Sequence, residues 1–261
     1  NGPVNLNRLG VIYDIVDRPE LKFPAFTPNL PAKIRSKSNL FEAIAKDDIL
    51  LHHPFESFVP VVDFVRKAAS DPHVLTIKQT LYRTGVSSAI VDALVNAAKR
   101  GIEVTVVIEL RARFDEEANI TLASRLQEAG VHVVYGVVGY KTHAKLCLVV
   151  RREGKRLRHY VHLGTGNYHS RTARIYTDYG LMTCDKNIGE DVHKIFHQLT
   201  SLGKVSKLDK LLQSPFSLHS TLLEKITREI KNAEQGLAAC IIFKVNSLVE
   251  KSIIRELYRA S

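Results

Sequence analysis

Hydrophobic and polar positions follow two different periods along the middle of the chain. Short runs rich in β-branched residues predict strands, and longer stretches with apolar residues three and four apart predict helices. The predicted strands cover 73–78, 103–109, 131–135, 144–150 and 159–163, and the predicted helices cover 88–98, 115–130 and much of 188–232. Strands that alternate with helices pair in parallel through right-handed crossovers, so this pattern predicts an α/β fold.

Residues with special capping and turn properties agree with these boundaries. Ser87 or Ser88 suits the start of the first of these helices, Gly101 suits its end, and Gly130 ends the next one. Residues 151–155 separate two predicted strands and have the composition of a hairpin turn. We therefore expect a mixed sheet, rich in parallel pairs and flanked by helices.

The two ends of the chain depart from the central pattern. Three prolines punctuate 23–31 and a basic stretch follows, so the first forty residues are expected to form a tail and a linker. Near the other end, 240–244 resembles the strand at 75–78, which also closes on a lysine. A polar loop and an amphipathic helix follow in both places, the second helix at 253–257. The chain is thus expected to begin a second copy of its α/β unit.

Composition is that of an ordinary globular protein. Hydrophobic residues make up 45% and charged residues 25% of the 261 positions. No apolar run approaches the roughly 20 residues that a membrane-spanning helix needs. The chain starts with Asn1 and has no signal-peptide pattern, so we expect a fragment of a longer protein. Three widely spaced cysteines, Cys147, Cys184 and Cys240, predict reduced side chains in the cytoplasm rather than a metal cluster or a disulfide scaffold.

The balance of charged residues indicates a class of binding partner. Lys and Arg number 37 against 27 Asp and Glu, a formal net charge of +10. Such an excess favours a polyanionic partner, which includes nucleic acid, an anionic membrane and a phosphate chain. An excess spread evenly over a solvated surface is the alternative. Composition does not choose among these.

The strongest local motif is His143-Ala144-Lys145, at the start of a predicted strand. Side chains two apart on a strand face the same way, so His143 and Lys145 would share one face. An imidazole can attack phosphorus, and a neighbouring ammonium would hold the phosphate oxygens during transfer. The alternative is a histidine at a sheet edge with a solvated lysine beside it.

About twenty residues after the HxK motif stands His162, and a second motif, GTGN, begins two residues after it at Gly164. Its two glycines let the backbone approach a ligand closely, Thr165 can donate a hydroxyl, and Asn167 can bind an oxygen or orient a histidine. If the two preceding strands pair as a hairpin, His162 lies near His143. The HxK motif followed by GxGN is much rarer than either part, although each alone is compatible with an ordinary loop.

Basic and aromatic side chains add candidate contacts. Arg83 and Arg113 follow two predicted strands, and ligands gather outside the carboxyl ends of strands in open α/β sheets. Guanidinium groups there suit bidentate phosphate binding, with surface ion pairs to Asp115 or Glu116 as the alternative. The ring of Tyr176 can stack on a base or belong to the core.

Together these residues resemble the phospholipase D superfamily, whose members form a covalent phosphohistidine. Within it, the chain is similar to the polyphosphate kinase family over most of its length. The similar blocks occur in the family's order, at 48–58, 78–83, 111–119, 142–145, 161–167 and 172–179. One departure is that Val149 and Val150 stand where the superfamily has an aspartate, which polyphosphate kinases also lack.

The resemblance implies reversible transfer of the ATP γ-phosphate to inorganic polyphosphate. It makes His143 the residue that takes the phosphate, with His162 and Lys145 assisting. It also implies that Tyr176 contacts the nucleotide, and we place Thr165 and Asn167 in the same ATP site. Arg83 and Arg113 match positions that the family associates with Mg²⁺. A guanidinium cannot ligate a cation, so these arginines are expected to hold the phosphate oxygens that carry the metal.

The resemblance also implies an organisation and partners. The expected division is the end of a helical domain with a linker over 1–30, a first phospholipase D-like catalytic domain over 31–210 and the truncated start of a second over 211–261. Another catalytic histidine and a nucleotide-binding arginine belong to the absent part, so the fragment itself is expected to be inactive. ATP or ADP and polyphosphate are the expected ligands, with self-association and a peripheral place at the inner membrane, and no nucleic acid. The alternatives are a phospholipase D-like phosphodiesterase and a polyanion-binding module without activity.

Overall fold

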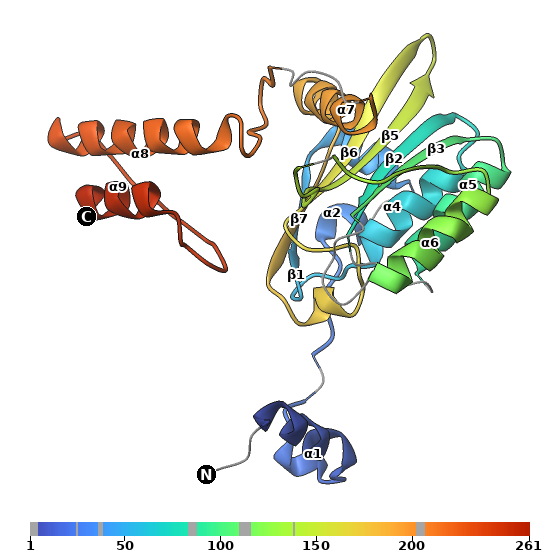
Figure 1. Ribbon diagram of the computed structural model, residues 1–261, viewed down its shortest axis with the longest axis horizontal. Coiled ribbons are helices and arrows are strands. Elements are labelled where there is room, and N and C mark those ends of the chain that lie inside the picture. Colours follow the sequence, from blue (N-terminus) through green and yellow to red (C-terminus); the bar gives the residue numbers. More distant parts are fainter. Residues whose placement is uncertain are drawn as a thin grey trace.

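The computed structural model describes most of the chain. The described residues are 5–24, 26–35, 39–82, 88–109, 116–137, 139–201 and 207–261. Within these ranges one sheet of seven strands forms the centre of the molecule, with helices on both of its faces (Figure 1). This arrangement confirms the predicted α/β class.

The sheet contains both parallel and antiparallel pairs. Its strands are β1 (Ile49–His53), β2 (Val74–Leu81), β3 (Glu103–Ile108), β4 (His132–Val134), β5 (Lys145–Glu153), β6 (Arg156–Gly164) and β7 (Asp178–Thr183). Their order is β1-β7-β6-β5-β2-β3-β4, and only β2–β3 and β3–β4 pair in parallel. The mixed sheet is confirmed, but the predicted excess of parallel pairs is wrong. The β5–β6 hairpin and the two strands that the pattern did not predict, β1 and β7, add the antiparallel pairs.

The helices divide between the two faces of the sheet and the two ends of the chain. The short elements near the start are η1 (Leu6–Leu9), α1 (Gly10–Ile15), η2 (Pro19–Leu21) and α2 (Ala32–Arg35). The others are α3 (Leu40–Lys46), α4 (Val59–Ser70), α5 (Ala89–Lys99), α6 (Glu116–Glu128), η3 (Thr172–Arg174), α7 (Lys186–Ser201), α8 (Leu218–Glu234) and α9 (Lys251–Ala260).

Two apolar clusters hold the layers together. On one face of the sheet, α3, α4, α5 and α6 bury side chains such as Phe64, Leu94 and Leu126. On the other face, α7 buries Val192 and Phe196 against β5 and β6. Each such side chain contributes about 1.5–3 kcal/mol when it is fully buried. The clusters fix the sheet as a rigid support for the loops at its ends.

Local boundaries agree with the capping residues. Ser88 caps α5, where its side chain accepts a hydrogen bond from the backbone N–H of Ile90 at 3.3 Å. Gly101 and Gly130 follow α5 and α6 with φ of +85° and +87°, a region that favours glycine. The predicted hairpin is also present, since Glu153 pairs with Arg156 across a two-residue turn.

Segments at both ends lie apart from the sheet. Figure 1 shows α1 and its neighbours joined to the rest by an extended stretch, and α8 and α9 side by side. Ile226, Ile230 and Ile253 form a small apolar cluster between these two helices. The helix predicted at 253–257 is present as part of α9. The strand predicted at 240–244 is wrong, because these residues are irregular and the Cys240 N–H donates to Glu229 instead of a neighbouring strand.

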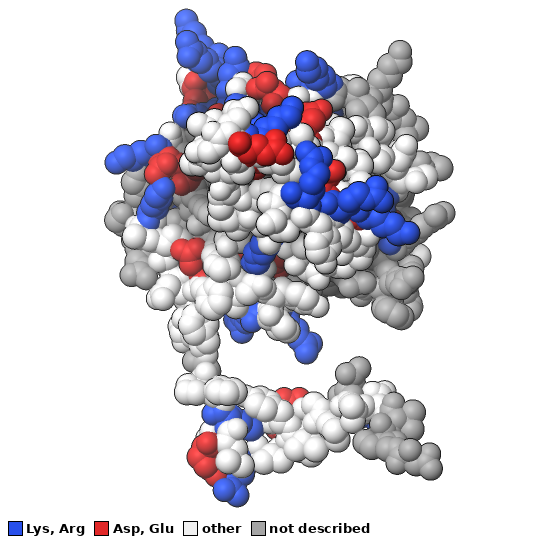
Figure 2. Space-filling model, turned by 90° about the vertical axis from the view of Figure 1, so that its left-hand side faces the viewer, with Lys and Arg blue, Asp and Glu red and all other residues white. Residues whose placement is uncertain are grey.

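The surface carries both signs of charge. Figure 2 shows Lys and Arg spread over one face together with Asp and Glu, without segregation of the two. Among the helices of the described ranges, none combines the length and the apolar character that crossing a bilayer requires.

A buried carboxylate fixes the path of the chain after α7. Asp191 is 0% exposed and accepts hydrogen bonds from the backbone N–H groups of Asp209 (2.9 Å), Lys210 (2.7 Å) and Leu211 (3.0 Å). Burial alone would raise the pKa of Asp191, but the three N–H groups and the nearby Lys194 outweigh it and lower the pKa. The ionised form of Asp191 therefore stabilises the fold.

Replacing Asp191 with asparagine is expected to lower the free energy of unfolding by about 2 kcal/mol at pH 7, because the charge that strengthens these bonds is lost. The folded-state pKa lies below the unfolded value. The carboxylate's contribution is therefore complete above the unfolded pKa and is lost as pH falls through the folded one. Urea unfolding at pH 7 and at successively lower pH should show the difference between wild type and variant shrinking in acid.

Glu190→Gln is the matched control for this prediction. Glu190 neighbours Asp191 but is exposed, and its carboxylate lies 3.8 Å from Lys186. Such an exposed pair contributes about 0–1 kcal/mol, so the control should unfold almost as the wild type does. Equal effects of the two substitutions would contradict the role given to Asp191.

Candidate active site

The loop before β5 is anchored by side chains from two neighbouring strands. Thr80 in β2 donates its hydroxyl to the carbonyl of Ala144 at 2.7 Å and accepts the N–H of Leu146 at 3.0 Å. Glu109, directly after β3, is buried, and its carboxylate accepts the N–H of Thr142 at 2.8 Å. These bonds fix the HxK segment at the carboxyl ends of two parallel strands, where ligands of α/β sheets bind.

Within this loop, His143 and Lys145 differ in exposure. His143 is exposed, and the edge of its ring contacts Tyr82 with 5.0 Å between ring centroids. Lys145 is only 6% exposed, and its Nζ donates to the backbone carbonyl of His143 at 2.5 Å. The same Nζ lies 5.2 Å from the centroid of the Tyr82 ring. An accessible imidazole thus stands beside a buried cation, and Lys145 is not the solvated lysine of the alternative interpretation.

The hairpin brings the two sequence motifs to the same end of the sheet. Lys145 pairs with Gly164, and Cys147 pairs with His162. His143 is four residues before Cys147, so at most about 14 Å of chain separates their Cα atoms. The two motifs therefore lie near each other, as predicted. The residue that pairs directly with His162 is Cys147, however, and not His143.

The GTGN loop is tied to the start of β7. Thr165 donates its hydroxyl to Asp178 at 2.9 Å and accepts the N–H of Tyr179 at 2.9 Å. A side chain at Gly166 would collide with the carboxylate of Asp178, so this position requires glycine. The Oδ1 atom of Asn167 is buried and has no hydrogen-bond partner among the described residues. Oδ1 of Asn167 is therefore an unused acceptor, whereas the Thr165 hydroxyl hydrogen is already used.

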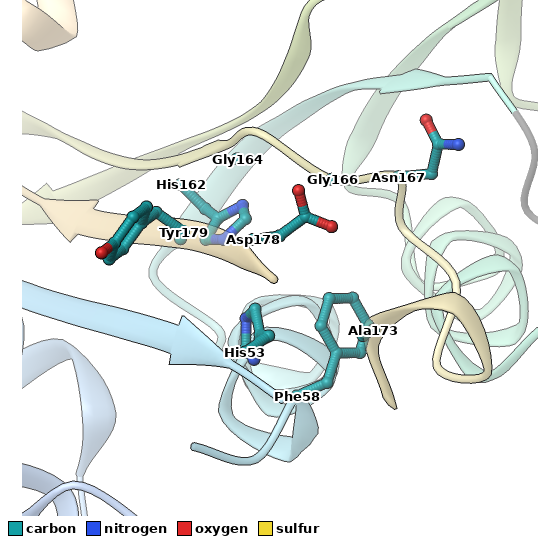
Figure 3. A pocket seen from close by; sticks show the side chains of 10 residues that line it. His53, Phe58, His162, Gly164, Gly166, Asn167, Ala173, Asp178 and Tyr179 are labelled. Atoms are coloured by element: carbon teal, nitrogen blue, oxygen red, sulfur yellow. The ribbon is translucent and has the colours of Figure 1, made fainter. Parts of the chain in front are cut away.

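A narrow pocket lies behind this loop (Figure 3). It has room for about one water molecule. The described residues that line it are His53, Phe58, His162, Gly164, Gly166, Asn167, Ala173, Asp178, Tyr179 and Gly180. The pocket therefore combines the GTGN motif with residues from β1 and β7, and His143 is not among its lining residues.

His162 is buried in this pocket and is neutral. It is 2% exposed, and its Nδ1 lies 2.8 Å from the hydroxyl of Tyr168. Burial, with a smaller contribution from His53, lowers the pKa of His162 to about 3. Burial also raises the pKa of Tyr168 well above its usual value, so its hydroxyl keeps its proton. Of the two acceptors within reach of the Tyr168 hydroxyl, Nδ1 at 2.8 Å is closer than the His162 carbonyl at 3.5 Å, and we assign the bond from Tyr168 to Nδ1 and the single ring proton of His162 to Nε2 on that basis.

The two predicted phosphate-binding arginines, Arg83 and Arg113, lie outside the described residues. The strands that precede them do lie side by side, because β2 and β3 pair in parallel up to Leu81 and Ile108. The side chain of Asn119 then donates to the carbonyl of Glu109 at 3.0 Å. The chain therefore leaves both strands at the same edge of the sheet.

The two tyrosines of the 172–179 block have different surroundings. Tyr176, just after η3, is 62% exposed, so its ring is not part of the core. The Tyr179 ring stacks on His52, with 4.5 Å between centroids and 13° between planes. Lys244 lies 4.5 Å from the centroid of Tyr179 and donates to the carbonyl of Thr177 at 3.1 Å. Tyr176 is therefore the more accessible of the two rings.

The described residues offer no ready-made metal site. No group of three or more His, Cys, Asp or Glu side chains in these ranges has a metal-binding arrangement. The carboxylate nearest the GTGN loop, Asp178, is bonded to Thr165. Mg²⁺ often enters sites of this kind with substrate phosphates and keeps several waters. The residues present thus fit a metal held mainly by the substrate.

Sequence patterns missed four members of this site. His53, Tyr168, Asp178 and Gly180 surround or support His162 in the folded chain. His53 and Asp178 come together because β1 pairs with β7, and neither strand was predicted. β1 and β7 are short, and more than a hundred residues separate them in the sequence. Only their pairing in the sheet shows that they contribute to the same site.

Comparisons with known proteins agree with these features. The family model for polyphosphate kinase C-terminal domain 1 matches residues 39–205, and the model for C-terminal domain 2 matches 211–261. Polyphosphate kinases from Xylella fastidiosa (strain 9a5c) and Pseudomonas aeruginosa are 61% and 58% identical over 261 residues. The alignments cover all of this chain but 37% and 38% of those proteins.

A solved structure leads to the same conclusion. The crystal structure of polyphosphate kinase from Porphyromonas gingivalis superposes with a TM-score of 0.87 and 35% sequence identity. The superposition covers 99% of this chain and 43% of that one. The chain spans well under half of the length of these relatives. On the matched family models and the identity along its whole length, the chain belongs to the polyphosphate kinase family.

Proposed function

We propose that this sequence carries the phosphate-accepting part of an ATP:polyphosphate phosphotransferase. The observation that carries the proposal is the accessible His143, anchored at the carboxyl ends of β2 and β3 beside the buried cation of Lys145. A nitrogen of the His143 imidazole attacks the γ-phosphorus of ATP. A P–N bond forms, the P–O bond to the β-phosphate breaks, and ADP leaves.

The second half of the reaction returns the histidine to its starting state. A terminal oxygen of polyphosphate attacks the phosphohistidine, a P–O bond forms and the P–N bond breaks. The chain is then longer by one phosphate, and the reverse sequence makes ATP. Lys145 holds the backbone of His143 through its hydrogen bond and places a positive charge near the transferred group. His162, buried and neutral, supports the site from within.

Charge and metal fit this substrate class. A net charge of +10 attracts a polyanion, and binding should weaken as salt screens the charges. Mg²⁺ would neutralise phosphate oxygens, which Arg83, Arg113 and the amide of Asn167 would also bind. Self-association and a place at the inner membrane are expectations from the family that accompany this proposal. The division of the chain into a first catalytic domain at 31–210 and the start of a second at 211–261 is part of the same proposal.

The test uses the full-length protein with ATP and Mg²⁺. Synthesis of polyphosphate, with a protein-bound phosphate that is labile in acid and stable in alkali, is the expected result. ATP-independent cleavage of a phosphodiester such as bis(p-nitrophenyl) phosphate, without polyphosphate synthesis, would replace the proposal with the phosphodiesterase alternative. Binding of polyphosphate without either reaction would favour a binding module.

Tyr176→Ala is expected to raise the KM for ATP about tenfold and to leave kcat within about threefold, because a base stacked on an aromatic ring gains about 1–3 kcal/mol. The exposed ring of Tyr176 is free of the core, so its removal should not change the melting temperature. Initial rates at varied ATP measure the effect.

Tyr258→Ala serves as the matched control for Tyr176. Tyr258 lies in α9 and is 79% exposed. The control should keep the wild-type KM. An unchanged KM in Tyr176→Ala would remove Tyr176 from the nucleotide site.

A further inference from the structure

The pocket behind the GTGN loop contains a second buried histidine with an unused nitrogen. His53, the last residue of β1, is 3% exposed, and the edge of its ring packs against Phe58 with 5.4 Å between centroids. Its Nδ1 lies 2.8 Å from the carbonyl oxygen of Glu56. A carbonyl only accepts, so Nδ1 carries a proton, and in the uncharged form of the ring Nε2 presents a lone pair. This Nε2 has no partner among the described residues.

His162 presents the complementary group. The bond from Tyr168 to Nδ1 leaves the proton of His162 on Nε2, and this atom is also buried without a partner among the described residues. One buried donor and one buried acceptor thus line the same narrow pocket (Figure 3). Leaving either unsatisfied would cost about 1–3 kcal/mol, so a bridge that satisfies both nitrogens is strongly favoured.

The sheet brings the two imidazoles together over a glycine. His53 pairs with Asp178 and His162 pairs with Met182, and Gly180 lies midway between these two residues of β7. Alternate residues of a strand share a face, so both rings lie on the side of β7 where Gly180 has no side chain. A Cβ at Gly180 would be 2.8 Å from Nε2 of His162 and 3.5 Å from Nε2 of His53. The two nitrogens are therefore at most 6.3 Å apart, the sum of these distances.

This separation suits one bridging oxygen atom. No direct hydrogen bond joins the two nitrogens, whereas a bridging atom with two hydrogen bonds of about 2.8–3.0 Å each fits within their 6.3 Å limit. The bridging atom must accept from His162 and donate to His53. An ionised phosphate oxygen can only accept, whereas water does both, and the pocket has room for about one water molecule.

We propose that His53 is a positioning residue for His162, accepting the Nε2–H hydrogen bond of His162 through one water molecule and so holding its ring and tautomer for phosphate transfer. This proposal rests on the proposed kinase function. His53 does not touch the substrate. It completes a chain from Tyr168 through His162 to the backbone carbonyl of Glu56, in which every buried ring nitrogen has a partner.

Three substitutions in the full-length enzyme distinguish the roles of the two ring nitrogens of His53. His53→Gln retains a polar group near the Nε2 position, His53→Asn retains only a donor near Nδ1, and His53→Leu retains neither at similar volume. Phosphate transfer from ATP to polyphosphate is the assay. We expect Gln to keep kcat within about threefold, and Asn and Leu to lower kcat about tenfold or more with little change in KM.

A purely structural role predicts a different order. Leucine suits a buried apolar site best, so Leu would then be the most active variant and Gln the least, following their melting temperatures. That order would overturn the proposal. Melting temperatures identify any variant that does not fold. If His53→Leu does not fold, the kcat of His53→Gln compared with that of His53→Asn still decides between the two roles.

A double substitution tests whether His53 acts through His162. In a His162→Ala background, His53→Asn should cause no further loss of kcat, because the group that it positions is gone. A full additional tenfold loss would show that His53 acts independently and would overturn the proposal. A wild-type enzyme without transfer activity would instead refute the proposed function, so the two failures are distinguishable.

Discussion

Replacing His143 with alanine in the full-length protein will abolish both the acid-labile phosphoenzyme and polyphosphate synthesis. His143 is the exposed imidazole of the anchored HxK loop, and the buried cation of Lys145 lies beside it. Loss of a covalent nucleophile lowers kcat by several orders of magnitude, and a fall of about 10³-fold or more is expected. Incubation with γ-labelled ATP and Mg²⁺, followed by acid and alkali treatment, measures the bound phosphate.

His132→Ala is the matched control for this experiment. His132 begins β4 and is exposed, and it is not among the residues that line the pocket. The control should be labelled like the wild type. Because the His143 side chain is exposed, its removal should leave the melting temperature unchanged, so a loss of label reports chemistry rather than unfolding. Normal labelling of His143→Ala would refute the assignment of the nucleophile.

Gly180→Ala is expected to lower the free energy of unfolding by about 1–3 kcal/mol and the transfer rate about 100-fold. The added methyl group would be 2.8 Å from Nε2 of His162, closer than real Cβ atoms approach, and the buried ring cannot swing into solvent. Overpacking of a close-packed site has costs of this size. Displacement of a positioned group by about 1 Å accounts for the rate effect. Thermal unfolding and initial rates measure the two effects.

Gly10→Ala is the control for the extra methyl group. Gly10 begins α1, and a Cβ there would meet nothing within 4 Å. Alanine also has the higher helix propensity, so this variant should be at least as stable as the wild type. Wild-type stability and activity in Gly180→Ala would show that the pocket is not as tightly packed as the geometry indicates.

The sequence determined the parts of the fold that depend on local order. Hydrophobic periodicity located β2, β3, β5, β6 and the helices between them, and Ser88 and the glycines marked their ends. The HxK and GTGN motifs identified His143, Lys145 and His162, because imidazole, ammonium and glycine at these spacings suit phosphate chemistry. Adjacent strands joined by a short turn must pair, so the nearness of the two motifs also followed from the sequence.

The residues that complete the site from distant parts of the sequence were found only in the folded chain. β1 and β7 are short and lie more than a hundred residues apart, and their pairing brings His53 against Asp178 and next to Gly180. Burial likewise depends on the whole fold, because both histidines belong to motifs that the sequence reveals, yet His143 is exposed and His162 is only 2% exposed. Local sequence specifies backbone preference and side-chain chemistry, whereas long-range packing sets solvent access, and solvent access distinguishes His143 from His162 as the proposed phosphate acceptor.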